Sequence, residues 1–125
     1  MEKSKIGRSN KRRGNDAERK YAKSFRDLGF ERCKTSRSES RNLDNAKVDL
    51  TDIPFNVQIK AGFKKGINYS GLLKEVEDAL SEAYPERLSL PTMIIHEKPV
   101  GKGKKRTKYN TLVILTFEDF KKLLK

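Results

Sequence analysis

The sequence predicts an α/β domain in which a single mixed β-sheet is flanked by helices. Two patterns support this class: stretches with apolar residues at helical spacing, and short stretches in which apolar and polar residues alternate. Their order along the chain is α-β-β-β-α-β-β-α, which is an α-β-β-β-α-β core with an added strand and a C-terminal helix. The length of 125 residues suits one domain with one modest core.

The first helix is expected to begin at Asn15, a good N-cap, and to end at Gly29. The preceding residues, 1–13, are basic and show no periodicity, so they are expected to form a flexible arm before a domain at 14–125. The alternating residues 30–35 predict the first strand. A polar loop is expected at 36–47, followed by strands at 48–50 and 55–61.

The second half of the chain predicts a helix capped by Ser70, with an apolar face that includes Val76 and Leu80. Residues 92–96 predict a short buried strand, 97–110 a basic loop and 112–115 a further strand. Thr116 is expected to cap the last helix. The apolar residues of that helix are expected to face inward, namely Phe120, Leu123 and Leu124.

The charge of the chain indicates a polyanionic partner. Charged residues make up 37% of the chain, hydrophobic residues 34%, and the net charge is +12. The excess of Lys and Arg is concentrated at the N-terminus and in residues 98–108. Such clusters are typical of proteins that bind nucleic acids.

Several other classes are disfavoured by what the sequence lacks. No apolar run approaches the ~20 residues of a membrane-spanning helix, and no apolar segment follows the basic N-terminus as in a secretory signal. Cys33 is the only cysteine, which excludes an internal disulfide and favours a reducing cytoplasm. His96 is the only histidine, which excludes a zinc finger. A catalytic pair of Cys33 and His96 is disfavoured because both fall in expected strands.

Polar residues interrupt the apolar pattern of two expected strands. Asp49 lies between Val48 and Leu50, and a turn should fold it back beside Gln58 and Lys60. Taken singly, each is explained as a strand-end aspartate or as the solvated face of a strand. Glu18 interrupts the apolar stripe of the first helix, where it either forms a capping pair at the helix start or reaches a metal at the sheet edge.

This order of residues resembles the PD-(D/E)XK, or restriction-endonuclease-like, nuclease superfamily. The shared features are a helical Glu, then an Asp, then a strand that reads acid-or-Gln, any residue, Lys, and the resemblance spans about residues 14–125. Within the superfamily, the chain is most similar to archaeal-type and phage Holliday junction resolvases. Residues 14–30 (GNDAERKYAKSFRDLGF) are similar to their first helix, and residues 36–47 to their Ser-rich loop.

The resemblance implies a Mg²⁺ site, at which Mn²⁺ would substitute, with Glu18, Asp49 and Gln58 as ligands. It also implies that Lys60 orients the attacking water or stabilises charge on the phosphate, and that Ser36 or Ser38 takes part. Gln58 departs from the family, which usually has Glu or Asp there, so a second metal is in doubt. Glu75 or Glu77 is a less favoured source of the missing charge.

The function implied is that of a metal-dependent endodeoxyribonuclease that makes paired cuts in four-way DNA junctions as a homodimer. Such an enzyme would serve DNA recombination and repair in a bacterial or archaeal cell, or in a phage-infected host. The alternatives are another nuclease of this fold, of nicking or restriction type, and a basic nucleic-acid-binding protein without catalysis. The residues expected to contact DNA are Lys11, Arg12, Arg13, Arg37, Arg41, Lys102, Lys104, Lys105, Arg106 and Lys108.

Overall fold

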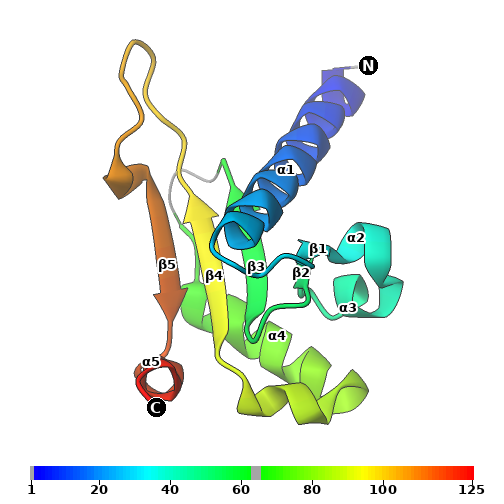
Figure 1. Ribbon diagram of the computed structural model, residues 1–125. Coiled ribbons are helices and arrows are strands. Elements are labelled where there is room, and N and C mark those ends of the chain that lie inside the picture. Colours follow the sequence, from blue (N-terminus) through cyan, green and yellow to red (C-terminus); the bar gives the residue numbers. More distant parts are fainter. Residues whose placement is uncertain (1, 63–65) are drawn as a thin grey trace.

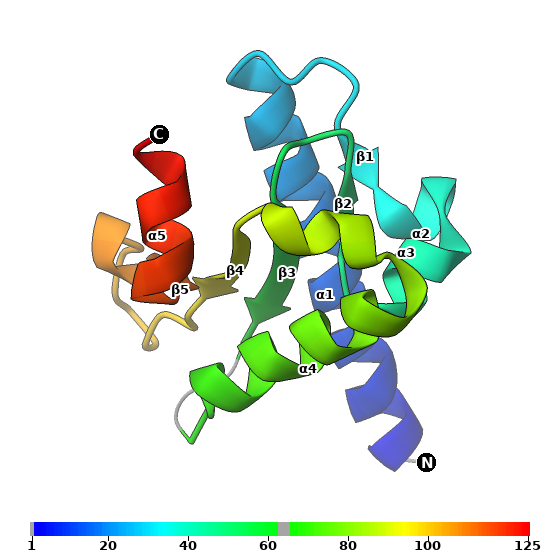
Figure 2. The same ribbon diagram turned by 90° about the horizontal axis from the view of Figure 1, so that it is seen from below.

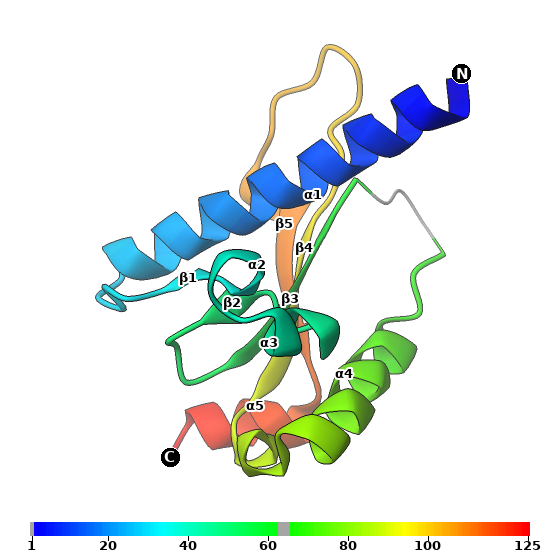
Figure 3. The same ribbon diagram turned by 90° about the vertical axis from the view of Figure 1, so that its right-hand side faces the viewer.

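The protein is a mixed α/β domain in which helices cover both faces of a small sheet, as the sequence predicts (Figure 1). The computed structural model describes residues 2–62 and 66–125. Helix α1 (Glu2–Asp27) crosses one face of the sheet, and helix α4 (Tyr69–Ala83) covers the other face (Figure 3). The larger core cluster joins α1 to the sheet, and a smaller one packs Val48 against Val76 and Leu80 of α4.

The described strands form two sheets. Strands β3 (Asn56–Ala61), β4 (Thr92–Glu97) and β5 (Thr111–Leu115) lie in that order, with β3 parallel to β4 and β5 antiparallel to it. Strands β1 (Lys34–Thr35) and β2 (Leu50–Thr51) form a separate antiparallel pair. The Asp49 N–H donates to the Val57 carbonyl at 2.7 Å, which connects the smaller sheet to the free edge of β3.

Helix α1 begins at Glu2, so the prediction of a helix start at Asn15 is wrong, and the described part of the expected arm is helical. Residues 11–13 are exposed, and this end of α1 projects beyond the sheet (Figures 1 and 3). Lys and Arg lose little side-chain freedom in a helix, so they extend a helix that is already nucleated. Residues 11–13 do not face the core, which agrees with the lack of apolar periodicity at these positions.

The segment expected as a polar loop folds into two short helices, α2 (Ser36–Glu39) and α3 (Arg41–Asn45). Ser40 caps α3, because its side chain accepts a hydrogen bond from the Leu43 N–H at 3.3 Å. The strand expected at 30–35 is confined to its last two residues. Phe30 packs instead against Phe25 and Phe55, with ring centroids 6.1 and 6.0 Å away.

The second half of the chain follows the predicted order with shifted ends. The N-cap of α4 is Asn68, whose side chain accepts from the Gly71 N–H at 3.0 Å, and not Ser70. Two 3₁₀ helices, η1 (Pro85–Ser89) and η2 (Lys108–Asn110), flank the connections to β4 and β5. Thr116 caps α5 (Phe117–Leu123) as predicted, with its hydroxyl accepting from the Asp119 N–H at 3.1 Å.

The inward face of α5 differs from the prediction. Phe120, Leu123 and Leu124 are 42%, 42% and 71% exposed, so the expectation that they pack inward is wrong. Asp119 is the buried residue of α5, and its carboxylate accepts a hydrogen bond from the Thr92 N–H at 3.1 Å. Among the helices of residues 2–62 and 66–125, none has the length and apolar character needed to cross a membrane.

Candidate metal centre

Glu18 is the first member of an acidic group at the junction of α1, α3 and the edge of β3. Its neighbours on α1, Ala17 and Ala22, belong to the core that covers the sheet, so Glu18 is carried into a buried position with a side chain 9% exposed. The guanidinium of Arg37 donates to both carboxylate oxygens, at 3.0 and 3.4 Å. Because α1 begins well before Asn15, the capping interpretation of Glu18 is wrong.

Asp49 is held against β3 by its backbone and its side chain. Its N–H donates to the Val57 carbonyl at 2.7 Å, and its carboxylate accepts from the Ile59 N–H at 2.7 Å. These two bonds bracket Gln58, so the segment before the turn folds back beside β3, as the sequence predicts. The position of the Asp49 carboxylate is therefore fixed by regular backbone and not by a flexible loop.

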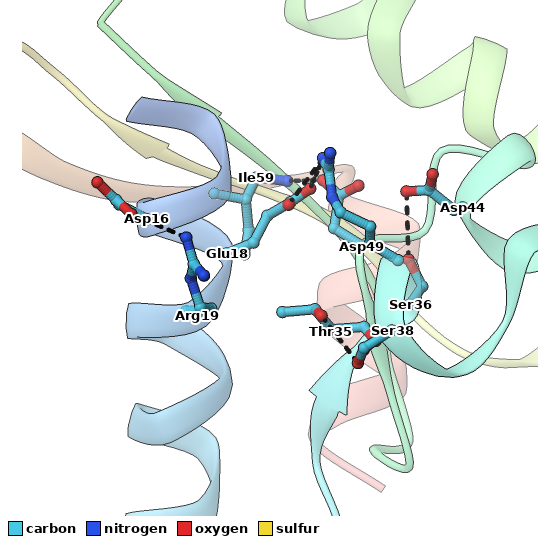
Figure 4. A network of polar contacts seen from close by, with 10 residues as sticks. Asp16, Glu18, Arg19, Thr35, Ser36, Ser38, Asp44, Asp49 and Ile59 are labelled. Atoms are coloured by element: carbon cyan, nitrogen blue, oxygen red, sulfur yellow. Dashed lines mark hydrogen bonds and ion pairs between the residues drawn. The ribbon is translucent and has the colours of Figure 1, made fainter. Parts of the chain in front are cut away.

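Glu18, Asp44 and Asp49 each present one carboxylate oxygen within 4.8 Å of the others. Figure 4 shows Glu18 and Asp49 extending toward the same space, with Asp44 on the far side of Asp49. Asp44 was not among the predicted residues, because it lies in the segment expected as a loop. Ser40 followed by Leu43 is a helix-start signal that could have predicted α3, although not that Asp44 would meet Asp49.

The electrostatics of this group favour a cation. The pKa of the Asp49 carboxyl is raised from 3.8 to about 7, chiefly by burial and further by the neighbouring Glu18 and Asp44 carboxylates, against the lowering effect of the Ile59 N–H. Three carboxylates in a partly enclosed place are the hard oxygen ligands that Mg²⁺ prefers. The donor set therefore fits a divalent cation.

Gln58 and Lys60 leave β3 on the face opposite to the α1 core. Val57 and Ile59 pack with α1, and strand side chains alternate between faces. Gln58 is 4% exposed, and its Oε1 atom has no hydrogen-bond partner among the described residues. Lys60 lines a hollow of about 300 Å³ at the start of α4, together with Asn68 and Glu75.

The structure separates the residues that the sequence offered as a further acidic ligand and as the serine of the site. Glu75 approaches Lys47 at 3.9 Å and is not one of the three grouped acids. Ser36 is buried, its N–H donates to the Asp49 carbonyl at 2.8 Å, and its hydroxyl lies 3.5 Å from Asp44. Ser38 instead donates to the Thr35 carbonyl at 2.9 Å. Ser36 is thus the serine that belongs to the acidic group.

The residues expected to contact DNA fall in several places. One hollow of about 590 Å³ lies between α1 and the 97–110 loop, and it is lined by Arg12, Arg13 and Arg106. Arg37 is committed to Glu18 and lines a hollow of about 400 Å³ beside it. The other expected contacts are exposed on α1, on α3 and on or next to the 97–110 loop, and they are Lys11, Arg41, Lys102, Lys104, Lys105 and Lys108.

Comparisons of the chain with family models, with curated proteins and with solved structures found no match. The function is therefore inferred from the acidic group, the strand beside it and the distribution of charge.

Proposed function

We propose that the protein is a metal-dependent endodeoxyribonuclease that cuts branched DNA, and that its substrate is the four-way junction. The observation that carries this proposal is the meeting of Glu18 with Asp49, whose carboxylate is held by the backbone of β3 directly before Lys60. A carboxylate pair that binds a cation, with an ammonium group on the adjacent strand, is suited to phosphodiester hydrolysis. The basic surface on α1 supports a nucleic-acid substrate.

In this proposal Glu18, Asp44 and Asp49 hold Mg²⁺, and Mn²⁺ replaces it. The bound cation supplies Lewis-acid activation of a phosphate oxygen and of a water molecule. The two backbone contacts of Asp49 bracket Gln58, and we propose that its neutral amide oxygen adds a ligand atom without adding negative charge. Ser36 positions Asp49 and Asp44 through its backbone N–H and its hydroxyl.

Lys60 is assigned the role of stabilising negative charge on the phosphate. Its strand neighbour Ile59 donates the hydrogen bond that fixes Asp49, so Lys60 follows this contact on a rigid strand, and we propose that its ammonium group reaches the phosphate from the hollow at the start of α4. An ammonium is a compact point charge, suited to a charge that develops in the transition state. Loss of this charge should reduce the rate of cutting more than the affinity for DNA.

The hollow lined by Arg12, Arg13 and Arg106 is assigned to the DNA backbone. Phosphate contacts of this kind give affinity that falls with salt and little sequence preference. Binding to this surface does not require the acidic group, so binding and cutting are separable by substitution.

A second candidate is a basic DNA-binding protein without catalysis. The observation that favours it is the ion pair between Arg37 and Glu18, which compensates one buried carboxylate without a metal. In that case the acidic group is structural, and removing it would leave DNA binding intact and no activity to lose.

The experiment incubates the protein with a synthetic four-way junction, a matched duplex and a single strand, with Mg²⁺ or with chelator. The test variant is Asp49→Asn, because the amide oxygen can still accept from the Ile59 N–H. The matched control is Asp78→Asn on the exposed side of α4, where the carboxylate pairs with Lys74. We expect Mg²⁺-dependent cutting by the parent and the control, and binding without cutting by Asp49→Asn.

The substrates in the same experiment separate the remaining alternatives. Paired cuts in the junction with intact duplex support a junction resolvase, whereas cuts in linear duplex support a nicking or restriction-type nuclease. No Mg²⁺-dependent product from any substrate would refute the enzyme proposal and leave the non-catalytic one.

A further inference from the structure

An exposed apolar surface extends over β5 and α5. Five of the eight large apolar side chains that are exposed in residues 11–62 and 66–125 lie within twelve consecutive residues of it. We name it the β5–α5 surface, and it consists of Val113 (55% exposed), Phe117 (72%), Phe120 (42%), Leu123 (42%) and Leu124 (71%). A concentration of this kind on one element pair is typical of a docking site.

The orientation of α5 is fixed by polar contacts, which is why its apolar stripe stays outside. The Asp119 carboxylate accepts from the Thr92 N–H at 3.1 Å, and the Lys122 ammonium donates to the Leu88 carbonyl at 3.1 Å. At about 100° per residue, the apolar residues of α5 form a stripe about 120° wide, and its centre lies about 110° from Asp119. Phe117 and Phe120 pack on one another, with ring centroids 6.2 Å apart.

Strand β5 gives this surface an open edge. It is the outer strand of the order β3-β4-β5, and among the described residues its ladder partner is β4 (Figure 1). Soluble proteins usually protect such an edge with Lys, Pro or a bulge. Residues 111–115 (TLVIL) contain no charge and no Pro, and Val113 at the centre is exposed. The edge is therefore competent to pair with another strand.

The charge of the surface identifies the class of partner. Residues 111–124 contain two acids and two bases, so they are neutral, whereas the whole chain carries +12. A nucleic acid or an acidic protein would prefer the basic remainder of the molecule. Within one copy Glu118 and Lys121 pair with each other at 3.0 Å, so two copies of this neutral surface meet without the repulsion that opposes contact elsewhere.

We propose that a second copy of this chain covers the β5–α5 surface, with the two β5 strands paired antiparallel about a twofold axis at Val113. An antiparallel pair of one strand with itself is twofold symmetric by construction, and full overlap of a five-residue strand places its middle residue on the axis. The need for a second copy to make the second cut in a junction rests on the proposed function. The exposed apolar surface and the neutral edge are independent of it.

The experiment measures molecular mass by sedimentation over a range of protein concentrations, in chelator and without DNA. The test variants are Val113→Lys and Phe117→Lys, and the control is Leu28→Lys, at a side chain 74% exposed at the end of α1. All three add the same charge at exposed positions, and circular dichroism checks that each is folded. We expect a dimer for the parent and the control, and at least tenfold weaker dimerisation for the two test variants.

A second measurement does not depend on disruption. In Val113→Cys the two engineered residues face each other, and directly opposed antiparallel residues have Cα atoms about 4.5–5.5 Å apart, within the range of a disulfide. Oxidation should cross-link Val113→Cys and not Leu28→Cys, and Cys33 does not interfere because it is fully buried.

Monomeric parent protein, a dimer that both Lys variants retain, or no cross-link at position 113 would each overturn the proposal. Failure of the nuclease proposal would be seen separately, because mass and cross-linking are read without any cutting.

Discussion

Replacement of Asp49 by Asn should stabilise the metal-free protein at alkaline pH. The folded protein raises the pKa of this carboxyl from 3.8 to about 7, chiefly through burial. Well below the unfolded pKa of 3.8, both folded and unfolded chains hold the proton, so the group is neutral in both. As the pH rises toward 7, the unfolded chain loses the proton first, which favours unfolding. An Asn at this position carries no proton to lose and escapes that penalty.

The magnitude follows from the two pKa values. The pKa rises from 3.8 in the unfolded chain to about 7 in the folded protein, and each pKa unit corresponds to about 1.36 kcal/mol. At pH 8 the ionised carboxyl therefore costs about 4 kcal/mol of folding free energy. The advantage of the Asn variant will be smaller, because its NH₂ group also needs a hydrogen-bond partner in the buried site. The hydrogen bond from the Ile59 N–H is retained, since an amide oxygen accepts as a carboxylate does.

The assay is urea unfolding in chelator at pH 5 and pH 8, for the parent, Asp49→Asn and the exposed control Asp78→Asn. The difference between Asp49→Asn and the parent should grow by about 3 kcal/mol from pH 5 to pH 8, while the control follows the parent. Added Mg²⁺ at pH 8 should stabilise the parent more than Asp49→Asn, because a ligand that binds the folded state stabilises it.

Two outcomes would refute this reasoning. If Asp49→Asn is less stable than the parent at pH 8, the ionised Asp49 carboxylate stabilises the metal-free protein and does not destabilise it. If the stability difference between Asp49→Asn and the parent is the same at pH 5 and pH 8, the carboxyl does not titrate in that range. The claim that burial raises the pKa of Asp49 would then be wrong.

Three further predictions concern other parts of the molecule. Asp119→Ala should destabilise the protein by about 2–3 kcal/mol in urea unfolding, because it leaves the buried Thr92 N–H without its acceptor; an unchanged midpoint would contradict this. Arg37→Gln should cost about 1–2 kcal/mol in chelator, less than a fully buried pair because the Arg37 side chain is 46% exposed, and Mg²⁺ should recover part of the loss. Replacing three exposed loop lysines by Ala should flatten the slope of log affinity for duplex against log salt by about 2–3, and an unchanged slope would place the DNA elsewhere; these are Lys102, Lys104 and Lys105.

Sequence periodicity predicted the order of the main elements because each of these buries an apolar face. Val57 and Ile59 on β3, and Val76 and Leu80 on α4, have the spacing of a strand and a helix, and they form the two cores. The start of α1 lacked this signal, since residues 11–13 contact solvent and not the core. In α5 the pattern misled, because the Asp119 hydrogen bond and not the apolar stripe decides which side is buried.

The sequence predicted the part of the candidate site that backbone pairing with β3 positions. It did not predict the part that the segment between β1 and β2 positions. Asp49 lies beside Gln58 because a turn returns the chain along β3. This could be predicted because alternating apolar and polar residues mark a strand in the sequence. Asp44 reaches the same place through two short helices, α2 and α3, whose path depends on tertiary contacts. The partner of Glu18 was missed for the same reason, because Arg37 lies on α2.

The charges around the acidic group bear on how many metal ions it can hold. Glu18, Asp44 and Asp49 contribute three negative charges, and Arg37 compensates one of them. The two that remain equal the charge of a single divalent cation, and without it the pKa of Asp49 is raised. An acid in place of Gln58 would add a further uncompensated charge next to Asp49 and would require a second cation. In the proposed nuclease, the amide at position 58 and the acid at position 44 together therefore leave charge for one metal ion.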